Sequence, residues 1–224
     1  MNQTLRIAVI GGTGPHGRGL AYRFARDGHT VTLGSRSAER AVAAAARLNV
    51  RLPGGPAVGG ARNERAAEAS ELVLLAVPWA GHAATVAGLR DQLAGKVVVS
   101  CLNPLGFDTD GPYGLDVPEG SAAEQAALLL PDSRVVGAFH HLWADALAGD
   151  AQYLDEDVLV CGDDAGAKRI VQELARAVTG RAGIDAGPLR LARLLEPFTA
   201  VLISVDRRYR THPGIAFTGL RAAG

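Results

Sequence analysis

The sequence predicts an α/β fold, in which a doubly wound parallel sheet is followed by a small C-terminal α/β domain. Over residues 5–100, apolar β-branched runs alternate with helical segments in the order β-α-β-α-β-α-β-α-β, the pattern of such a sheet. The chain is only 5% aromatic and rich in Ala and Val, as suits helices packed closely on a parallel sheet. Its 224 residues fit one domain plus a small second one, which we place at 1–150 and 151–224.

Capping residues mark the helices of the first half. Pro15 suits the first turn of a helix that stops at Gly28, and Ser37 suits the N-cap of the next helix. The nearly continuous apolar run 71–77 is typical of a strand buried on both faces. The expected strands are 5–10, 30–33, a short one within 51–60, 71–77 and 96–100, and the expected helices are 15–26, 38–48, 63–69 and 79–94.

The second half contains a long loop and the elements of the smaller domain. Residues 105–120 are rich in Gly, Pro and Asp, and a loop of this length is often functional. Ser121 and Glu124 form a capping box at the start of the next helix. The further strands are 134–139, 158–161, 182–185 and a small terminal one within 211–220, and the further helices are 122–130, 163–179 and 188–208, with Pro197 inside the last.

A glycine motif follows the first strand. Gly12, Gly14 and Gly17 stand in G-x-G-x-x-G register between an apolar strand and a helix, which is the context that this motif requires. The first glycine permits a tight turn, the second lets the backbone approach a pyrophosphate, and the third lets the helix pack on the strand. The pyrophosphate would lie on the free N–H groups of the helix N-terminus. The motif therefore predicts a Rossmann-type dinucleotide-binding domain.

The end of the second strand predicts which dinucleotide binds. An NAD site usually places Asp or Glu there, where the carboxylate accepts hydrogen bonds from the ribose. This chain has Ser35 and Arg36 instead, and Arg40 follows about one helical turn later. A carboxylate would repel a 2′-phosphate, whereas a hydroxyl and two guanidinium groups would bind it. We therefore expect NADP(H), with a merely solvated arginine cluster as the alternative interpretation.

Composition and motifs exclude several other classes of function. Lys plus Arg and Asp plus Glu number 23 each, so the sequence shows no basic footprint for nucleic acid. No apolar run is long enough to span a membrane, and the first strand begins too early for a signal peptide to precede it. Cys101 and Cys161 are expected to be buried free thiols of a cytoplasmic protein. No metal site is expected, because the histidines lack the spacing of metal ligands.

Ligands of such sheets bind beyond the carboxyl ends of the strands, so residues at those ends are site candidates. His140 and His141 follow one strand and, being adjacent, should point to opposite sides, so that one faces the ligand. That histidine is either a hydrogen-bond or proton donor near neutral pH, or a structural residue bonded to backbone. Trp79 is either a wall for a flat ring or a core residue. A late group of arginines either holds an anionic tail or forms a solvated helix face, namely Arg193, Arg207, Arg208 and Arg210.

Several stretches together resemble the NADP-dependent reductases of the deazaflavin coenzyme F420, the F420H2:NADP+ oxidoreductases. The stretches are Gly11–Gly14, Gly34–Arg36, Val77–Trp79, Val98–Ser100, Val160–Asp164 and Asp185–Leu189. They extend over nearly the whole chain, and the late Cys-Gly-Asp-Asp and Asp-Ala-Gly-Pro-Leu strings are much more specific than the glycine motif. The resemblance implies that a hydride passes directly between NADP(H) and F420, whose rings stack in a cleft between the two domains.

The resemblance also implies a set of ligand contacts. The pyrophosphate is held by the glycine turn, here Thr13, Gly14, Pro15 and His16, and the 2′-phosphate by Ser35, Arg36 and Arg40. The nicotinamide lies near Val77, Trp79, Asn103 and Ala144, and the deazaflavin near His140, Leu142 and Pro213. We assign no catalytic residue, because hydride transfer between two cofactors needs proximity and orientation more than acid–base catalysis. His140 is the best candidate for tuning the deazaflavin by hydrogen bonding.

Two other functions stay open on the residues alone. One is an NADPH-dependent imine or ketone reductase, which needs a proton donor beside its substrate. The other is a non-catalytic NADP(H)-binding sensor, because fold alone does not determine function. A sensor should lack a pocket beside the nicotinamide large enough for a tricyclic ring. The expected partners are the small-molecule cofactors and a second copy of the chain, because two-fold dimers are the commonest closed oligomers and the C-terminal helix is apolar enough for an interface.

Overall fold

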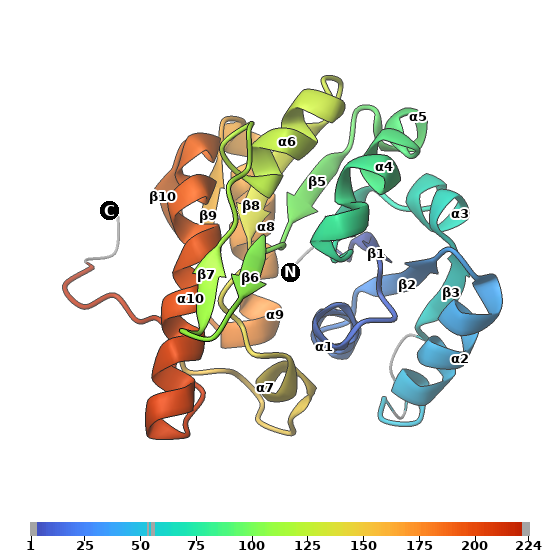
Figure 1. Cartoon of the computed structure of the whole chain (residues 1–224). Coiled ribbons are helices and arrows are strands. Elements are labelled where there is room, and N and C mark those ends of the chain that lie inside the picture. The colour runs from blue at the N-terminus through green and yellow to red at the C-terminus, as the bar shows by residue number, and fades with distance from the viewer. Residues whose placement is uncertain (1–3, 53, 55–56, 221–224) are drawn as a thin grey trace.

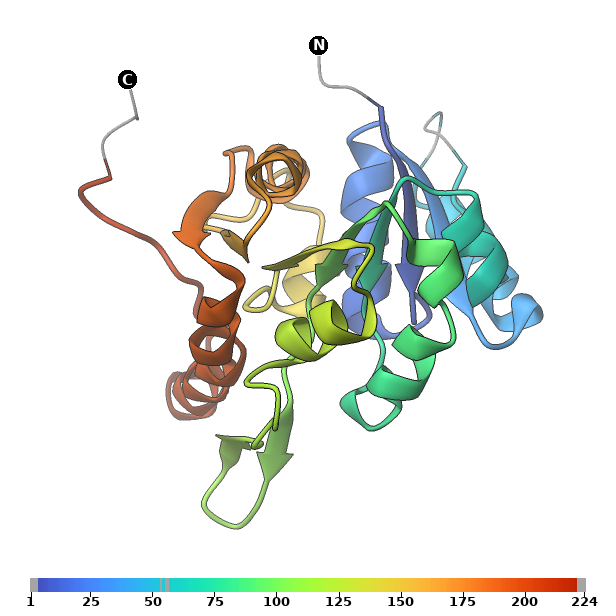
Figure 2. The same cartoon turned by 90° about the horizontal axis from the view of Figure 1, so that it is seen from above.

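The computed structural model describes residues 4–52, 54 and 57–220. Within this part, eight strands form one sheet in the order β10-β9-β8-β5-β4-β1-β2-β3, and helices cover both of its faces (Figures 1 and 2). The strands are β1 (Arg6–Ile10), β2 (Thr30–Ser35), β3 (Gly59–Arg62), β4 (Leu72–Leu75), β5 (Val97–Ser100), β8 (Arg134–Ala138), β9 (Leu159–Gly162) and β10 (Ile184–Gly187). The expected α/β fold is confirmed. The expectation about a signal peptide concerns Met1–Gln3, which lie outside the described residues.

The strands change direction once. The sheet is parallel from β3 through β2, β1, β4 and β5 to β8. β9 then runs antiparallel to β8, and β10 runs parallel to β9. The connection from β8 to β9 contains only the short helix α7 (Ala144–Ala148), and antiparallel neighbours need no crossover helix. Because β9 and β10 extend the same sheet past residue 150, the division into two domains stays a prediction.

Both faces of the sheet are buried. Along β1, Ile7 and Val9 pack into one hydrophobic cluster, and Ala8 and Ile10 pack into a second, as the alternation of side chains along a strand requires. The first cluster includes residues of α1 (Pro15–Arg26), α2 (Ala38–Asn49) and α8 (Ala165–Leu174), and the second includes residues of α3 (Asn63–Glu68), α4 (His82–Ala87) and α6 (Ala122–Leu129). These two layers fix the carboxyl ends of the parallel strands relative to one another.

Helices begin where capping residues predict. Pro15 occupies the first turn of α1. At the start of α2, Ser37 Oγ accepts a hydrogen bond from Arg40 N at 3.2 Å. At the start of α6, Ser121 Oγ accepts one from Glu124 N at 3.0 Å. These bonds satisfy backbone donors that the first turn of a helix leaves free.

Several predicted elements are divided or differ. The helix expected over 79–94 is divided into η1 (Trp79–Gly81), α4 and α5 (Arg90–Leu93), because glycines weaken its interior at Gly81 and Gly88. The loop expected over 105–120 contains a hairpin of β6 (Leu105–Phe107) and β7 (Pro112–Gly114). The helix expected over 163–179 consists of α8 and α9 (Arg176–Thr179), and that over 188–208 of η2 (Leu189–Leu191) and α10 (Ala192–Tyr209).

The prediction of a small strand within 211–220 is wrong. This segment is described and pairs with no strand of either sheet in the described part of the chain. Pro213 cannot donate to a strand ladder, and Gly214 weakens one, which is the physical reason. The segment instead bonds to Asp157, whose N–H donates to Ile215 O at 2.7 Å.

One buried arginine fastens the connection after β8 to α1. Arg23 is fully buried and donates hydrogen bonds to the carbonyl oxygens of Ala146 at 2.7 Å, Leu147 at 2.8 Å and Ala151 at 2.6 Å. A buried charge is tolerated where acceptors satisfy its donors. Arg23 therefore holds α7 against the helix that follows the glycine motif.

Candidate functional site

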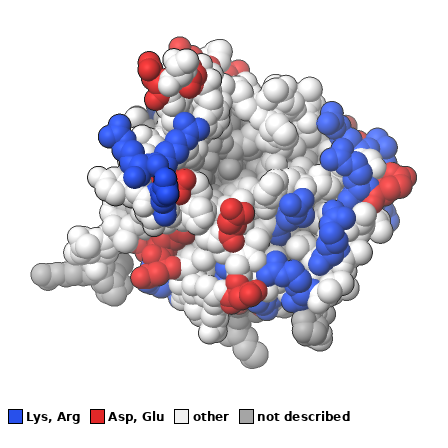
Figure 3. All heavy atoms as spheres, turned by 60° about the horizontal axis from the view of Figure 1, so that its bottom comes forward, with Lys and Arg blue, Asp and Glu red and all other residues white. Residues whose placement is uncertain are grey.

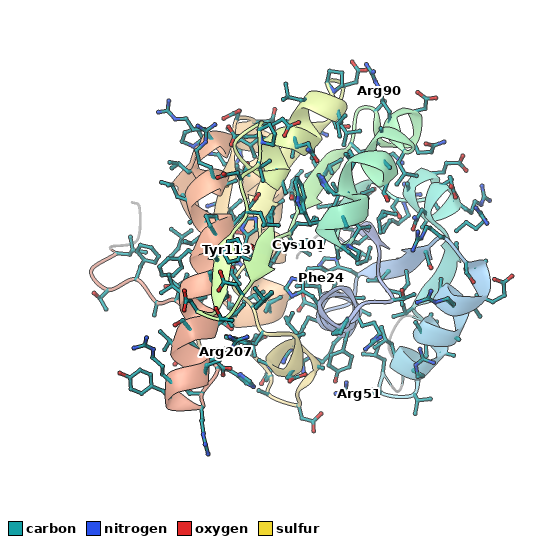
Figure 4. The ribbon with its side chains drawn as sticks, in the orientation of Figure 1. Phe24, Arg51, Arg90, Cys101, Tyr113 and Arg207 are labelled. Atoms are coloured by element: carbon teal, nitrogen blue, oxygen red, sulfur yellow. The ribbon has the colours of Figure 1, made fainter. Side chains whose placement is uncertain are left out.

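The predicted site residues gather around one cavity of about 1150 Å³, at the carboxyl ends of the parallel strands. Figure 3 shows a hollowed face with Lys and Arg side chains on two sides of the hollow. Cys101, directly after β5, lines the cavity and lies near the middle of the molecule (Figure 4). The predicted residues that line it are Thr13, Gly14, Pro15, His16, Ser35, Arg36, Arg40, Val77, Trp79, Asn103, His140, Leu142 and Ala144. Gly12 and Pro213 are not among the described residues that line it.

The glycine motif leaves an open N-terminus on α1. Gly14 is the N-cap, no side chain caps the helix, and its first turn has no acidic residue. A Cβ added at Gly12 would lie 2.7 Å from Val9 O, and one at Gly17 would lie 3.1 Å from Gly12 Cα, so these two positions require glycine for packing. A Cβ at Gly14 would meet only Gly11 O at 3.6 Å. The space above Gly14 therefore belongs to the cavity, and the free N–H groups there fit a pyrophosphate.

The end of β2 carries the groups predicted for a 2′-phosphate. Ser35 is 8% exposed, and its Oγ accepts a hydrogen bond from Ser37 N at 3.3 Å, which leaves the hydroxyl hydrogen for a ligand. Arg36 and Arg40 are exposed. The neighbouring ion pairs join Arg62 to Glu64 and Arg65 to Glu68, and no ion pair within the described ranges involves Arg36 or Arg40. Both guanidinium groups are free to bind an anion.

Asn63 lies in the same wall, although the sequence patterns did not point to it. It is 7% exposed, it lines the cavity, and its Oδ1 has no hydrogen-bond partner among the described residues. β3 pairs with β2 so that Arg62 lies beside Ser35, which brings the next residue to the same edge. Its position directly after a strand is the feature of the sequence that could have indicated a site residue. An unpaired buried acceptor fits a hydroxyl or amine donor of a ligand.

Asn103 and Trp79, which are predicted to lie near the nicotinamide, both line the cavity. Asn103 Nδ2 donates a hydrogen bond to His140 O at 2.7 Å, and Asn103 Oδ1 is buried with no partner in the described part. An unpaired amide oxygen suits the N–H of a nicotinamide carboxamide. Trp79 is half-buried, and its ring stacks on that of His82 with centroids 5.5 Å apart and planes at 28°.

Among the described residues, three histidines line the cavity, and burial favours the neutral form of each. Burial lowers the pKa of His16 to about 4 and that of His140 to about 3, and it also lowers the pKa of His141. His140 is 3% exposed, and neither of its ring nitrogens has a hydrogen-bond partner in the described chain. His141 Nε2 is bonded to Leu195 O at 2.7 Å. These groups are poor proton donors at neutral pH, and the two ring nitrogens of His140 are buried.

The expectation that the adjacent histidines point to opposite sides is corrected. Phe139 has a φ of 64°, so the strand alternation ends with β8. Both histidines are among the residues that line the cavity, and their ring centroids are 6.0 Å apart. A left-handed conformation at a bulky residue costs on the order of 1–3 kcal/mol and persists only where packing enforces it. Phe139 is 2% exposed and packs edge-on against Phe24, with centroids 5.7 Å apart.

A further wall comes from parts of the chain that carried no motif. Trp143, in the segment after β8, lines the cavity together with Thr199, Leu202 and Ile203 of α10. Trp143 Nε1 donates a hydrogen bond to Pro213 O at 2.8 Å. Pro213 therefore contacts the lining from behind, and its predicted contact with a ligand stays a prediction.

The late arginines lie away from this cavity. Arg193 pairs with Glu124, and Arg207 lies over the ring of Phe107, with its guanidinium carbon 5.7 Å from the centroid. Figure 4 shows Arg207 on the lower part of α10, on the side of the hairpin that carries Tyr113. Arg193 and Arg207 thus contact neighbouring elements, and Arg208 and Arg210 are exposed.

The described part of the chain contains neither a cluster of metal ligands nor an ionised cysteine. No cluster of three or more His, Cys, Asp or Glu side chains suitable for a metal ion occurs among these residues. Cys101 and Cys161 are buried free thiols, and burial raises the pKa of each to about 12, so neither is a thiolate at neutral pH. No helix in residues 4–52, 54 and 57–220 has the length and apolar character to cross a membrane.

Comparison with known proteins identifies the family. The chain is 39% identical over 222 residues to an F420-dependent NADP reductase of Methanothermobacter thermautotrophicus, and the alignment covers 96% of each chain. The chain belongs to the F420-dependent NADP reductase family. The family model described as "NADP oxidoreductase coenzyme F420-dependent" matches residues 6–104 of this family member. The resemblance found in the sequence is thereby confirmed.

Solved structures agree with membership of the F420-dependent NADP reductase family. A putative F420-dependent NADP reductase from Arthrobacter sp. FB24 is 31% identical with a TM-score of 0.78, and the match covers 97% of this chain and 100% of that one. An imine reductase from Bacillus cereus is 21% identical with a TM-score of 0.62, over 91% of this chain and 62% of that one. This second likeness shows the shared fold alone.

Proposed function

We propose that this family member transfers a hydride between NADP(H) and coenzyme F420, directly from ring to ring. The observation that carries the proposal is the single cavity of about 1150 Å³, lined from the end of β2 to the end of β8. These two strands are four positions apart in the sheet, about 19 Å at the usual strand spacing. A small-molecule site usually measures about 300–1,000 Å³, so this cavity is larger than a usual single site, which supports a second ligand beside NADP(H).

The NADP end is built from charge and free backbone donors. The open N-terminus of α1 at Gly14 suits the pyrophosphate, and Ser35, Arg36 and Arg40 suit the 2′-phosphate. The unpaired Oδ1 of Asn103 suits the nicotinamide carboxamide. These groups together would fix the nicotinamide over the middle of the sheet edge.

The other end is uncharged and largely apolar. Leu142, Trp143 and Leu202 line it, and His140 offers two ring nitrogens without partners. When both cofactors are bound, their rings supply the hydride chemistry, and the protein contributes orientation and a water-poor surface. Neutral imidazoles there place no unpaired charge beside the rings. Both ring nitrogens of His140 are buried, so a hydrogen bond from His140 to the polar edge of the deazaflavin would need the imidazole to turn toward the cavity.

The same geometry disfavours both alternatives. An imine or ketone reductase needs a proton donor, but burial lowers the pKa of His16 to about 4 and of His140 to about 3. A non-catalytic sensor needs no space for a second ring system, whereas this cavity continues past the nicotinamide position to α10.

We further propose a cytoplasmic homodimer. Two buried free thiols suit a reducing compartment. On α10, Leu194, Phe198 and Val201 are 64%, 41% and 51% exposed at helical spacing, which supports an interface between two copies. Light scattering after size-exclusion chromatography tests this: a monomer at micromolar concentration would refute the dimer.

The decisive experiment mixes the protein with NADPH and oxidised F420 and follows the absorbance of the oxidised deazaflavin. We expect catalytic bleaching with NADPH and much slower bleaching with NADH as the matched control. NADPH oxidation by simple imines or ketones, tested in parallel, should be absent. No bleaching at micromolar protein would refute the proposed function, and turnover of an imine alone would replace it.

A further inference from the structure

The chain has two tryptophans, and both line the same cavity. Each indole is backed by a histidine in stacked geometry. Trp79 stacks on His82, and Trp143 stacks on His212 with ring centroids 4.9 Å apart and planes at 26°. Trp79 follows β4 and Trp143 follows β8, and these strands are two positions apart in the sheet, about 10 Å at the usual spacing. The two tryptophans therefore follow strands on either side of β5, and both residues line the one cavity.

Trp143 is held in place by the segment that follows α10. Its Nε1 donates to Pro213 O at 2.8 Å, so its only polar group is satisfied by the protein. The histidine behind it is itself fixed, because His212 Nδ1 lies 3.2 Å from Asp206 Oδ1. What the half-buried indole offers the cavity is therefore an aromatic surface, and a flat uncharged ring is the ligand that such a surface binds.

The segment is anchored again beyond that contact. Asp157 N donates to Ile215 O at 2.7 Å, and Phe217 N donates to Asp157 Oδ2 at 2.8 Å. Residues 212–217 thus extend from the end of α10 to the residues just before β9. The segment contacts Trp143 at one end and is bonded to Asp157 at the other. Pro213 meets Trp143 and is not among the described residues that line the cavity.

We propose that Trp143 is the stacking wall for the second ring, the deazaflavin if the function proposed above holds, and that residues 212–217 position it. The C-terminal segment then acts on this ligand through Trp143 rather than by touching it. Trp79 is the corresponding wall on the NADP side. Trp143 is a ligand-binding residue in this scheme, and His212 is a positioning residue.

The first test compares the affinities of Trp143 variants for F420 and for NADP+. Trp143→Ala should raise the Kd for oxidised F420 about tenfold, as expected when one stacking contact is lost, and leave the Kd for NADP+ within about twofold. Trp143→Phe keeps an aromatic surface and should stay within about threefold of wild type for both. A deazaflavin without the anionic tail should show the same pattern. Wild-type F420 affinity in Trp143→Ala, or equal losses for both ligands, overturns the proposal.

The second test asks whether the segment positions the indole. In a Trp79→Phe background Trp143 is the sole tryptophan, so acrylamide quenching of its fluorescence reports its exposure without any ligand. His212→Ala should increase that quenching and raise the KM for F420 several-fold with kcat nearly unchanged. Leu220→Ala is the matched control, because its side chain is 59% exposed just beyond this segment, and it should change neither value. Unchanged quenching and KM in His212→Ala overturn the positioning role.

The failures of the two proposals are distinguishable. If the wild-type protein binds NADP+ but neither binds nor reduces F420, the proposed function fails and this inference fails with it. If the wild type reduces F420 and Trp143→Ala does so with unchanged KM, only the stacking role fails.

Discussion

Removing the two arginines at the end of β2 should weaken NADP+ binding and leave NAD+ binding nearly unchanged. Two unit charges 4 Å apart interact by about 1 kcal/mol in bulk water and about 4 kcal/mol near a protein surface. Arg36 and Arg40 are exposed, so the lower part of this range applies to each. For Arg36→Ala combined with Arg40→Ala we expect a loss of about 3 kcal/mol, which is roughly 150-fold in the Kd for NADP+. Ser35, which is 8% exposed, would retain part of the contact.

Isothermal titration calorimetry with NADP+ and NAD+ measures both affinities for each variant. The difference between wild type and the double variant should shrink at high salt, because exposed charges are screened. Arg47→Ala is the matched control, since Arg47 is exposed in the last turn of the same helix and is not among the described residues lining the cavity. Equal losses for NADP+ and NAD+ would refute the 2′-phosphate role.

Three further predictions concern the scaffold. Gly17→Val should lower the free energy of unfolding by about 1–3 kcal/mol, because the new side chain would contact Gly12. Gly14→Ala should leave the thermal unfolding temperature unchanged and weaken NADP+ binding. Arg23→Met should lower the free energy of unfolding in urea by about 3 kcal/mol, because several carbonyl groups lose their donor; an unchanged midpoint contradicts this. Burial raises the pKa of Glu156 from 4.5 to about 7, so the contribution of Glu156 to stability should fall as pH rises from 4.5 to 7. Glu156→Gln lacks this loss and should exceed wild type by about 3 kcal/mol at pH 8 but not at pH 4, whereas a pH-independent difference would rule the group out.

The N-terminal half of the fold is encoded in local patterns. The helix Pro15–Arg26 has the predicted bounds because a proline and a following glycine mark its ends. Ser37 and Ser121 make the capping bonds that their positions predict. The antiparallel junction between β8 and β9 was not predictable, because the residues within a strand do not encode its direction. The path between the two strands sets that direction.

The same distinction holds at the site. Ser35 and Arg36 follow a strand that the glycine motif itself locates, so their place was predictable. Asn63 reaches the cavity only because β3 pairs with β2, and Trp143 owes its position to packing against residues about 70 positions away. The sequence pattern pointed to His140. The direction in which His141 points depends on the φ of 64° at Phe139, and a phenylalanine in the sequence does not indicate such a conformation.

The reversal of direction at β9 places two parts of the cavity wall on separate elements. Because β10 ends at the sheet edge away from the cavity, the chain must return through α10, whose 18 residues span about 27 Å. It reaches the cavity at a single stretch, through Thr199, Leu202 and Ile203. One continuous helix thus carries part of the wall proposed for the second ligand, whereas the groups suited to phosphate lie at the ends of earlier strands. Substitutions at Thr199, Leu202 or Ile203 would therefore alter that wall without touching the residues suited to phosphate.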